Sequence, residues 1–173
     1  KTMTAKYGAA YVDIYRSTML QSSLDVEALV RDDLAASLQL LIDQQGLHGT
    51  GSSNQVTGVA ATSGIGSVVG GTDGAAPTWA NIVALETEVA TDNADIGRLA
   101  YITNPKVRGK LKSTVVGTDQ GMVWPVTAGP MGPVNGYTVY TTSQVSSTLT
   151  KGSSNVASAI FFGNWAELVI GLW

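Results

Sequence analysis

The chain contains 173 residues, of which 44% are hydrophobic and 13% are charged, and its formal net charge at pH 7 is −3. The hydrophobic share excludes a disordered chain, and the length allows one domain or two small ones. Without a basic block or tail, the chain is not expected to bind nucleic acid through the phosphates. Without cysteine, it cannot form disulfides or thiolate metal sites.

The low charge content also bears on the surface. The charged share is about half of the ~25% that is usual in globular domains, so Ser, Thr, Gly and some apolar side chains must be exposed. Such a surface is tolerated where a partner covers it, but a β-rich domain with Ser/Thr-rich strands explains it equally well. No apolar run approaches the ~18 residues of a membrane-spanning helix, and we expect no membrane partner.

The first predicted elements are a strand and a long helix. Residues 11–15 alternate in polarity, with Val12 and Ile14 on one face, which is typical of a strand. Residues 24–45 carry apolar side chains at three-to-four spacing, which predicts an amphipathic helix about 33 Å long. The apolar stripe of this helix would consist of Val30, Leu34, Leu38, Leu41 and Ile42.

The ends of this helix carry capping signals. Ser22 or Ser23 can accept a hydrogen bond from an unpaired amide of the first turn. Gly46 follows the last periodic position, and glycine enters the left-handed conformation that closes many helices without a Cβ clash. We therefore expect the helix to begin just after these serines and to end at Gly46.

The middle of the chain is predicted to contain a loop, a helix and a strand. Residues 48–77 are rich in Gly, Ser and Thr, which indicates either a flexible loop or a pair of weak strands. Thr78 should cap a second helix that extends to about Ala94. A short strand is expected at residues 99–103.

Asn104 and Pro105 predict the start of a third helix. The asparagine side chain can accept a hydrogen bond from an unpaired amide, and the fixed φ of proline suits the first helical position. We expect this helix to extend to Lys112, with Val107 and Leu111 turned inward.

The last third of the chain is predicted to consist mainly of strands and turns. Residues 119–121, Asp-Gln-Gly, indicate a turn, and Asn135-Gly136 indicates a hairpin because both central positions of a type I′ turn need positive φ. The composite is an α+β fold. Strands are expected at residues 138–144, 159–162 and 166–173, with a loop at 151–155 and a turn at 163–164.

No combination of residues meets the requirements of a catalytic site. His48 is the single histidine, and we expect it to have a structural or solvent-facing role. Residues 49–54 are rich in glycine like a phosphate-binding loop, but they follow a helix and lack the Lys-Ser/Thr ending. Asp32 and Asp33 are neighbours on a helix, so they point about 100° apart and do not converge.

Other polar and aromatic residues are also explained by structural roles. Glu86 and Glu88 lie on a predicted helix without converging. The lysines Lys6, Lys106, Lys110 and Lys112 are too few and too dispersed for a nucleic-acid groove. Tryptophans can stack on sugars or bases, but two of the four lie where core packing is favoured; they are Trp79, Trp124, Trp165 and Trp173. We expect no catalytic, cofactor-binding or metal-binding residues, no cofactor and no enzymatic activity.

In its order of signals the chain resembles the major capsid proteins of tailed bacteriophages, the Hong Kong 97-like family. The family pattern has a strand leading to an Ile-Ser-Arg-like segment, a long spine helix and a Gly-x-Gly-x-x-x-x-Pro-x-Gly loop. An Asn-Pro strand with a short helix, a Gly-x-Pro-Val strand and a Phe-Gly-Asp/Asn step complete it. The matching residues are 13–16, 24–45, 49–58, 102–111, 134–140 and 162–165. The chain departs from the pattern at Tyr15, where the family has Ser, and at Val56 or Thr57, where it has Pro.

The resemblance implies a Hong Kong 97-like capsid fold. Residues 1–47 would form part of the peripheral domain with the spine helix, and residues 48–173 would form most of the axial domain. The family's N-terminal arm, extended hairpin loop and C-terminal strand would lie outside this chain. The start at Lys1 and the stop at Trp173, inside an apolar run, also lead us to expect a fragment of a longer protein.

The resemblance further implies a structural subunit of an icosahedral phage or prophage capsid, which self-assembles into pentamers and hexamers around packaged DNA. The expected partners are copies of the same protein, with scaffold and portal proteins as further candidates and no sequence-specific nucleic acid. The protein would be made in the bacterial cytoplasm and reside in the virion capsid. The alternatives are an encapsulin-type compartment shell, a non-catalytic Ser/Thr-rich surface binding module, and a hydrolase that uses one of the serines.

Overall fold

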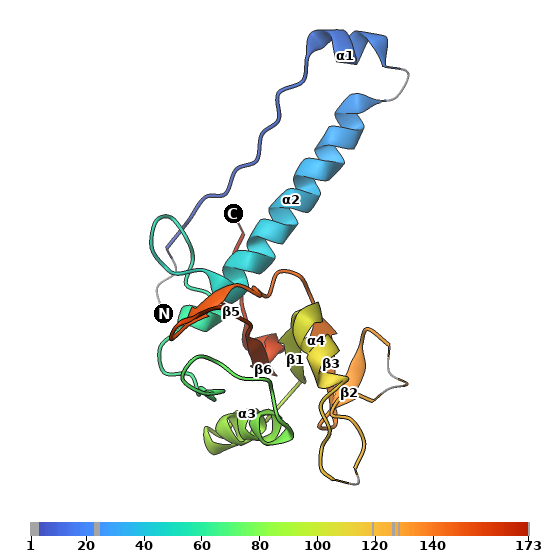
Figure 1. Ribbon diagram of the computed structural model, residues 1–173. Helices are drawn as coiled ribbons and strands as arrows, with labels where there is room; N and C mark the ends of the chain where they lie inside the picture. The colour runs from blue at the N-terminus through green and yellow to red at the C-terminus, as the bar shows by residue number, and fades with distance from the viewer. Residues whose placement is uncertain (1–3, 23–24, 119, 126, 128, 173) are drawn as a thin grey trace. The chain divides into compact units, whose positions relative to one another are not determined.

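The computed structural model describes residues 4–22, 25–118, 120–125, 127 and 129–172. The chain divides into two compact units, an N-terminal unit, Lys1–Thr62, and a C-terminal unit, Ser63–Trp173. Both helices and strands are present, which confirms the α+β class (Figure 1).

The N-terminal unit contains an extended segment, helix α1 (Arg16–Gln21), the long helix α2 (Val26–His48) and the 3₁₀ turn η1 (Val59–Ala61). The extended segment runs beside α2 toward α1 (Figure 1). A Cβ atom on Gly8 would lie 2.8 Å from Leu41 Cδ2 of α2. The strand expected at residues 11–15 is wrong. The neighbour of this segment is a helix, whose backbone groups already bond to one another and cannot form a strand ladder.

Helix α2 begins and ends later than the sequence predicts. Its N-cap is Asp25, whose side chain accepts a hydrogen bond from the Ala28 amide at 3.1 Å. The prediction of a serine cap is wrong for Ser22, which closes α1 instead. Ser23 lies outside the described residues. An aspartate at this position also stabilises the positive end of the helix dipole.

The end of α2 is determined by the loop that follows it. The prediction that Gly46 ends the helix is wrong, because α2 continues through His48 and Gly49 is its C-cap. A Cβ atom on Gly49 would lie 2.2 Å from the carbonyl oxygen of Val56. Glycine is needed here because the returning backbone approaches closely. Its φ of −56° is available to any residue.

The C-terminal unit is built on a four-stranded mixed sheet. Its strands are β1 (Leu99–Thr103), β2 (Gly132–Val134), β3 (Tyr137–Thr141) and β6 (Ile160–Asn164), in the order β2-β3-β1-β6. Strand β1 is parallel to β3 and antiparallel to β6. In this register Tyr101 lies opposite both Val139 and Phe162, which forms an apolar row across three strands.

Two helices of this unit begin where the sequence predicts. Thr78 caps α3 (Trp79–Thr91), and its hydroxyl oxygen accepts a hydrogen bond from the Asn81 amide at 3.3 Å. Asn104 caps α4 (Pro105–Leu111) by accepting a hydrogen bond from the Val107 amide at 2.9 Å. Helix α3 ends at Thr91, before the expected Ala94.

Two predicted turns have different outcomes. Asn135 and Gly136 have φ angles of 53° and 79° and join the antiparallel strands β2 and β3, which confirms the hairpin. Strand β3 ends at Thr141, earlier than expected. Asp119 of the other predicted turn lies outside the described residues. Beside it, the Val116 amide donates to the Gly121 carbonyl at 2.9 Å.

The C-terminal region departs most from the sequence predictions. The loop expected at 151–155 is wrong, because strands β4 (Leu149–Lys151) and β5 (Ser154–Ala157) form a hairpin there. The turn expected at 163–164 is also wrong, because β6 continues through Asn164. The strand expected at 166–173 is wrong within the described residues, where the 3₁₀ turn η2 (Trp165–Glu167) is followed by extended chain. An apolar run does not form a strand without a neighbouring backbone to bond.

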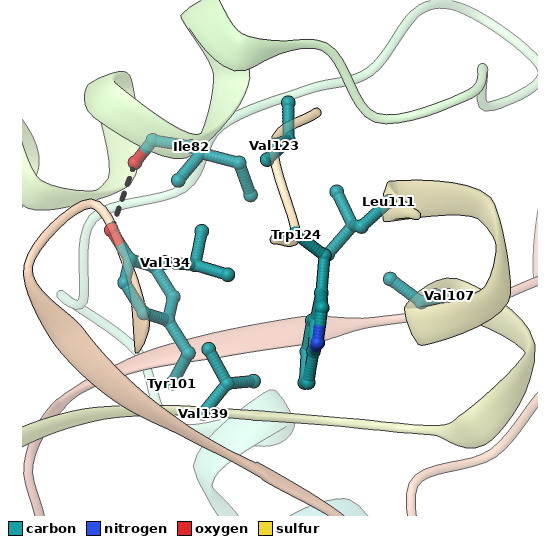
Figure 2. Packing of buried hydrophobic residues seen from close by; sticks show 8 residues of the cluster. All are labelled: Ile82, Tyr101, Val107, Leu111, Val123, Trp124, Val134 and Val139. Carbon is teal, nitrogen blue, oxygen red and sulfur yellow. Dashed lines mark hydrogen bonds between the residues drawn. The ribbon is translucent and has the colours of Figure 1, made fainter. Parts of the chain in front are cut away.

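The core of the C-terminal unit lies between the sheet and the helices α3 and α4. Trp124 is fully buried and packs between Ile82 of α3 and Leu111 of α4 (Figure 2). Tyr101 donates its hydroxyl hydrogen to the Ile82 carbonyl at 3.1 Å. Val107 and Leu111 are buried, as predicted. The remaining members of this cluster are Val123, Val134 and Val139.

Candidate functional surfaces

The glycine-rich loop after α2 bonds to itself. The Gly51 amide donates to the Val56 carbonyl at 3.0 Å, and the Gly58 amide donates to the Gly49 carbonyl at 2.8 Å. The Thr50 amide donates to a glutamine side chain of the same loop. These amides are therefore committed within the loop and do not form an open cradle for phosphate.

The titratable residues of α2 do not converge. His48 ends the helix half-buried, and burial lowers the pKa of its imidazole below the usual 6.5. Asp32 and Asp33 are exposed near the middle of the same helix. In the described residues no three metal-ligating side chains of the His, Asp and Glu type come together. No helix in those ranges is long and apolar enough to span a membrane.

The tryptophans in the described part of the C-terminal unit serve its packing. Trp124 is fully buried, and Trp79 is half-buried against the core cluster. Trp165 donates its indole hydrogen to the Ala100 carbonyl at 2.8 Å, which fixes η2 to the edge of β1. Trp173 lies outside the described residues. The lysines are less dispersed than predicted, because Lys106 and Lys110 are exposed on α4 and Lys112 is half-buried at its C-cap, while Lys6 is exposed in the N-terminal unit.

A polar contact that the sequence analysis missed joins α3 to the β2–β3 hairpin. Glu86 of α3 accepts a hydrogen bond from the Tyr137 hydroxyl at 2.8 Å and another from the Asn135 side-chain amide. The hydrogen bond to Glu86 is the main cause that raises the pKa of Tyr137. The Asn135-Gly136 hairpin was recognisable, but its partner on a helix 49 residues earlier has no local signal.

The N-terminal unit exposes a row of tyrosines. Tyr7, Tyr11 and Tyr15 are 80%, 88% and 83% exposed. They are four residues apart along the extended segment, and Tyr15 is the N-cap of α1. Gly8 of the same segment lies against α2. A tyrosine row of this kind is suited to an interface, because each ring supplies a large contact area at low entropic cost.

The long helix α2 is the second exposed apolar surface. Leu47 is its one fully buried residue among the 23. The predicted apolar stripe is only half-buried, and Leu29 and Leu40 are 65% and 50% exposed. A shallow open groove runs along the helix, lined by Glu27, Val30, Arg31, Leu34, Ala35 and Leu38. A helix with this much uncovered apolar surface is typical of one that packs against a further chain or segment.

The end of the C-terminal unit provides a third apolar surface. After η2 the chain continues in extended form, and Leu168, Val169, Ile170 and Leu172 are all exposed. These residues pair with no strand in the described part of the chain. Extended apolar chain with unpaired backbone groups is able to add to the edge of another sheet.

Two comparisons with known proteins identify the family of the chain. The model of the phage capsid family matches residues 1–173. The major capsid protein of Halomonas phage phiHAP-1 is 31% identical over 163 residues, which cover 94% of this chain and 24% of that relative. The chain thus spans about a quarter of the relative's length. The chain therefore belongs to the phage capsid family, whose members are structural proteins of the virion capsid.

Proposed function

We propose that this chain is part of a structural subunit that self-assembles with copies of itself into an icosahedral phage or prophage shell, without catalytic activity. The observation that carries the proposal is the exposure of α2, a 23-residue helix with a single buried residue. Family membership supports the same reading.

The physical argument concerns the free energy of the exposed apolar surface. Burying apolar surface contributes roughly 25 cal/mol per Å² to stability. Leu29, Leu40 and the three exposed tyrosines do not contribute this free energy while they remain in water. Contiguous apolar surface of this kind marks interaction sites in soluble proteins. In a shell, each subunit covers such a surface with its neighbours or with the rest of its own polypeptide.

We further propose the Hong Kong 97-like fold, with residues 1–47 in the peripheral domain and residues 48–173 forming most of the axial domain. The order of elements supports it: a long helix, a tight glycine loop, the Asn104-capped helix and the β2–β3 hairpin follow one another as in the family pattern. The two compact units divide between Thr62 and Ser63, later in the chain than the proposed domain boundary, so the glycine loop groups with the helix before it. Pentamers and hexamers of the complete protein, enclosing DNA, would be the assembled state.

The alternatives predict different observations. An encapsulin-type shell would also assemble, but it would enclose cargo enzymes, and its neighbouring genes would encode them in place of terminase and portal proteins. A Ser/Thr-rich binding module would remain a discrete monomer with saturable binding of a glycan or peptide. A hydrolase would lose its activity in the His48→Ala variant, whereas shell assembly should not change. The description of the matched family and the name of the relative favour the capsid.

Sedimentation velocity of the complete gene product tests the proposal. We expect particles far larger than a monomer. Leu40→Lys should reduce assembly strongly because it places a charge at an exposed leucine of α2, whereas Gln39→Lys, at the adjacent exposed position, should leave assembly unchanged. Equal behaviour of the two variants, or a wild-type protein that stays monomeric while binding a ligand saturably, would contradict the proposal.

A further inference from the structure

Helices α3 and α4 of the C-terminal unit each carry charged residues of one sign. Glu88 and Asp92 lie one turn apart along the side and end of α3, and both are exposed. Lys106 and Lys110 lie one turn apart on α4 and are also exposed. No basic residue occurs in positions 86–95, and no acidic residue occurs in positions 104–118. We name these two surfaces the acidic flank (Glu88 and Asp92) and the basic flank (Lys106 and Lys110).

Neither flank is neutralised within its own unit. In the ranges that the structure describes, the ion pair found is Arg31–Glu27 of α2, at 2.8 Å. On the basic flank, the Lys106 ammonium reaches a backbone carbonyl, that of Val156, at 3.5 Å. On the acidic flank, Asp92 lies at the C-terminal end of α3, where the helix dipole already concentrates negative charge. The unit therefore has one negative and one positive surface. The negative charge of Asp92 is locally unfavourable because it adds to that of the helix dipole.

The two flanks belong to helices on different sides of the core. Trp124 fills the space between Ile82 of α3 and Leu111 of α4, and the helices lie on either side of it (Figure 2). The charged side chains project away from this packed interior, since all four are exposed. The acidic surface thus has a matching surface of opposite sign on every copy of the chain.

We propose that the acidic flank of one copy docks on the basic flank of the next copy. This inference rests on the proposed function, because it identifies surfaces through which the capsid subunit would bind itself. A contact between two different surfaces of identical chains is heterologous, and its repetition closes into a ring when the rotation permits. Exposed ion pairs contribute little individually. Their complementarity fixes the direction and register of the neighbours and repels the wrong arrangement.

Charge reversal in the complete gene product tests the docking. The acidic-flank variant, Glu88→Lys with Asp92→Lys, has two positive flanks. The basic-flank variant, Lys106→Glu with Lys110→Glu, has two negative flanks. We expect each to lose rings and shells in electron micrographs, and we expect the chain that carries all four substitutions to regain them. The fourfold variant keeps the wild-type net charge, so its recovery also controls for the change in net charge of the two double variants.

Mixing the two assembly-deficient variants provides a sharper test. Each variant can dock only on the other, so the mixture should form rings in which the two alternate. Alternation is complete only in a ring with an even number of subunits. The mixture should therefore form six-membered rings and fail to form five-membered ones.

The outcomes separate this inference from the proposed function. A wild-type protein that does not assemble would contradict both. If the wild-type protein assembles and the acidic-flank and basic-flank variants assemble equally well, the docking is contradicted but the proposed function is not. Loss of assembly without recovery in the mixture and in the fourfold variant would also overturn it. Both double variants should melt at the temperature of the wild-type protein, so that a loss of assembly is not a loss of folding. A basic-flank variant that assembles but fails to retain DNA would contradict the docking too, since the basic flank would then contact nucleic acid.

Discussion

The Tyr137 hydroxyl donates a hydrogen bond to Glu86 across the C-terminal unit, with 2.8 Å between the two oxygens. The residues are 51 positions apart in the sequence and belong to β3 and α3. Asn135, in the turn of the same hairpin, bonds to the other oxygen of this carboxylate. One side chain of α3 therefore bonds both to the turn of the β2–β3 hairpin and to the first residue of β3.

The first prediction concerns this carboxylate. Glu86→Ala removes the acceptor of both hydrogen bonds and should lower the free energy of unfolding by about 1.5–3 kcal/mol, the range for hydrogen bonds to charged groups. Urea denaturation of the chain would measure the change. Glu88→Ala, two residues later on the exposed side of the helix, should change it by no more than about 0.5 kcal/mol. Equal losses would show that the Glu86 contacts do not stabilise the fold.

The second prediction concerns alkaline pH. Burial raises the pKa of Tyr101 to about 12, and the bond to Glu86 raises the pKa of Tyr137. A phenol whose pKa is higher in the folded state than in the unfolded state favours folding while it is protonated. The unfolded chain releases these protons first, so stability should be full below about pH 10 and should fall as the pH rises toward 12.

Unfolding midpoints measured from pH 8 to 12 would test this dependence. Tyr101→Phe cannot ionise at this position, so its stability should fall less steeply over the alkaline range than that of the wild-type protein. Its stability at neutral pH should be lower, because the hydrogen bond to the Ile82 carbonyl is lost. Parallel pH profiles for the two proteins would show that Tyr101 does not contribute to the dependence.

The third prediction compares two leucines on different helices. Leu111 of α4 is 2% exposed within the core, whereas Leu38 of α2 is half-buried beside an open groove. Leu111→Ala should cost the isolated chain about 2–5 kcal/mol, as a buried leucine does, and Leu38→Ala should cost clearly less. In the assembled protein Leu38→Ala should become more costly, which thermal disruption of the particles would report. Similar costs in the isolated chain would indicate that α2 is already covered.

The fourth prediction concerns Asn104, which is 2% exposed. Its Oδ1 caps α4, and its Nδ2 donates to the Ser146 carbonyl at 3.1 Å, so it bonds to two segments. Asn104→Ala should cost about 1–3 kcal/mol, because a helix cap is lost and a buried carbonyl loses its donor. Asp25→Ala removes a cap on the exposed end of α2 and should cost about 1 kcal/mol or less. Chemical denaturation of both variants gives the comparison.

The parts of the fold that the sequence predicts are those with local causes. Thr78 and Asn104 each bond to an amide three residues later, so their caps are visible in any window of the sequence. Asn135-Gly136 forms its turn because of the φ angles that these residues tolerate. Strand β1 and the inward positions of α4 follow from periodicity in the same way.

The errors occur where the structure depends on a distant neighbour. Residues 11–15 and 168–172 have the composition of strands, but neither segment has a strand beside it in the described chain. Gly49, and not Gly46, is the glycine that α2 needs, because the backbone of Val56 returns against it. The Glu86 contacts depend on packing between α3 and a hairpin about 50 residues away.

The candidate surfaces also combine features that the local sequence predicts with features that depend on the fold. The helical spacing of Asp32 and Asp33 relative to His48 is local, and the structure keeps the two aspartates away from the histidine along one helix. The apolar stripe of α2 was also recognised, but periodicity alone assigns such a stripe to a core. Only the three-dimensional arrangement reveals that the stripe is half-exposed.

Electron microscopy of the complete gene product, purified without chaotropes at several salt and protein concentrations, tests the central claim most directly. A capsid subunit should form closed shells, or five- and six-membered rings, with this chain contributing to the contacts between neighbours. A protein that remains strictly monomeric under all of these conditions would contradict the account.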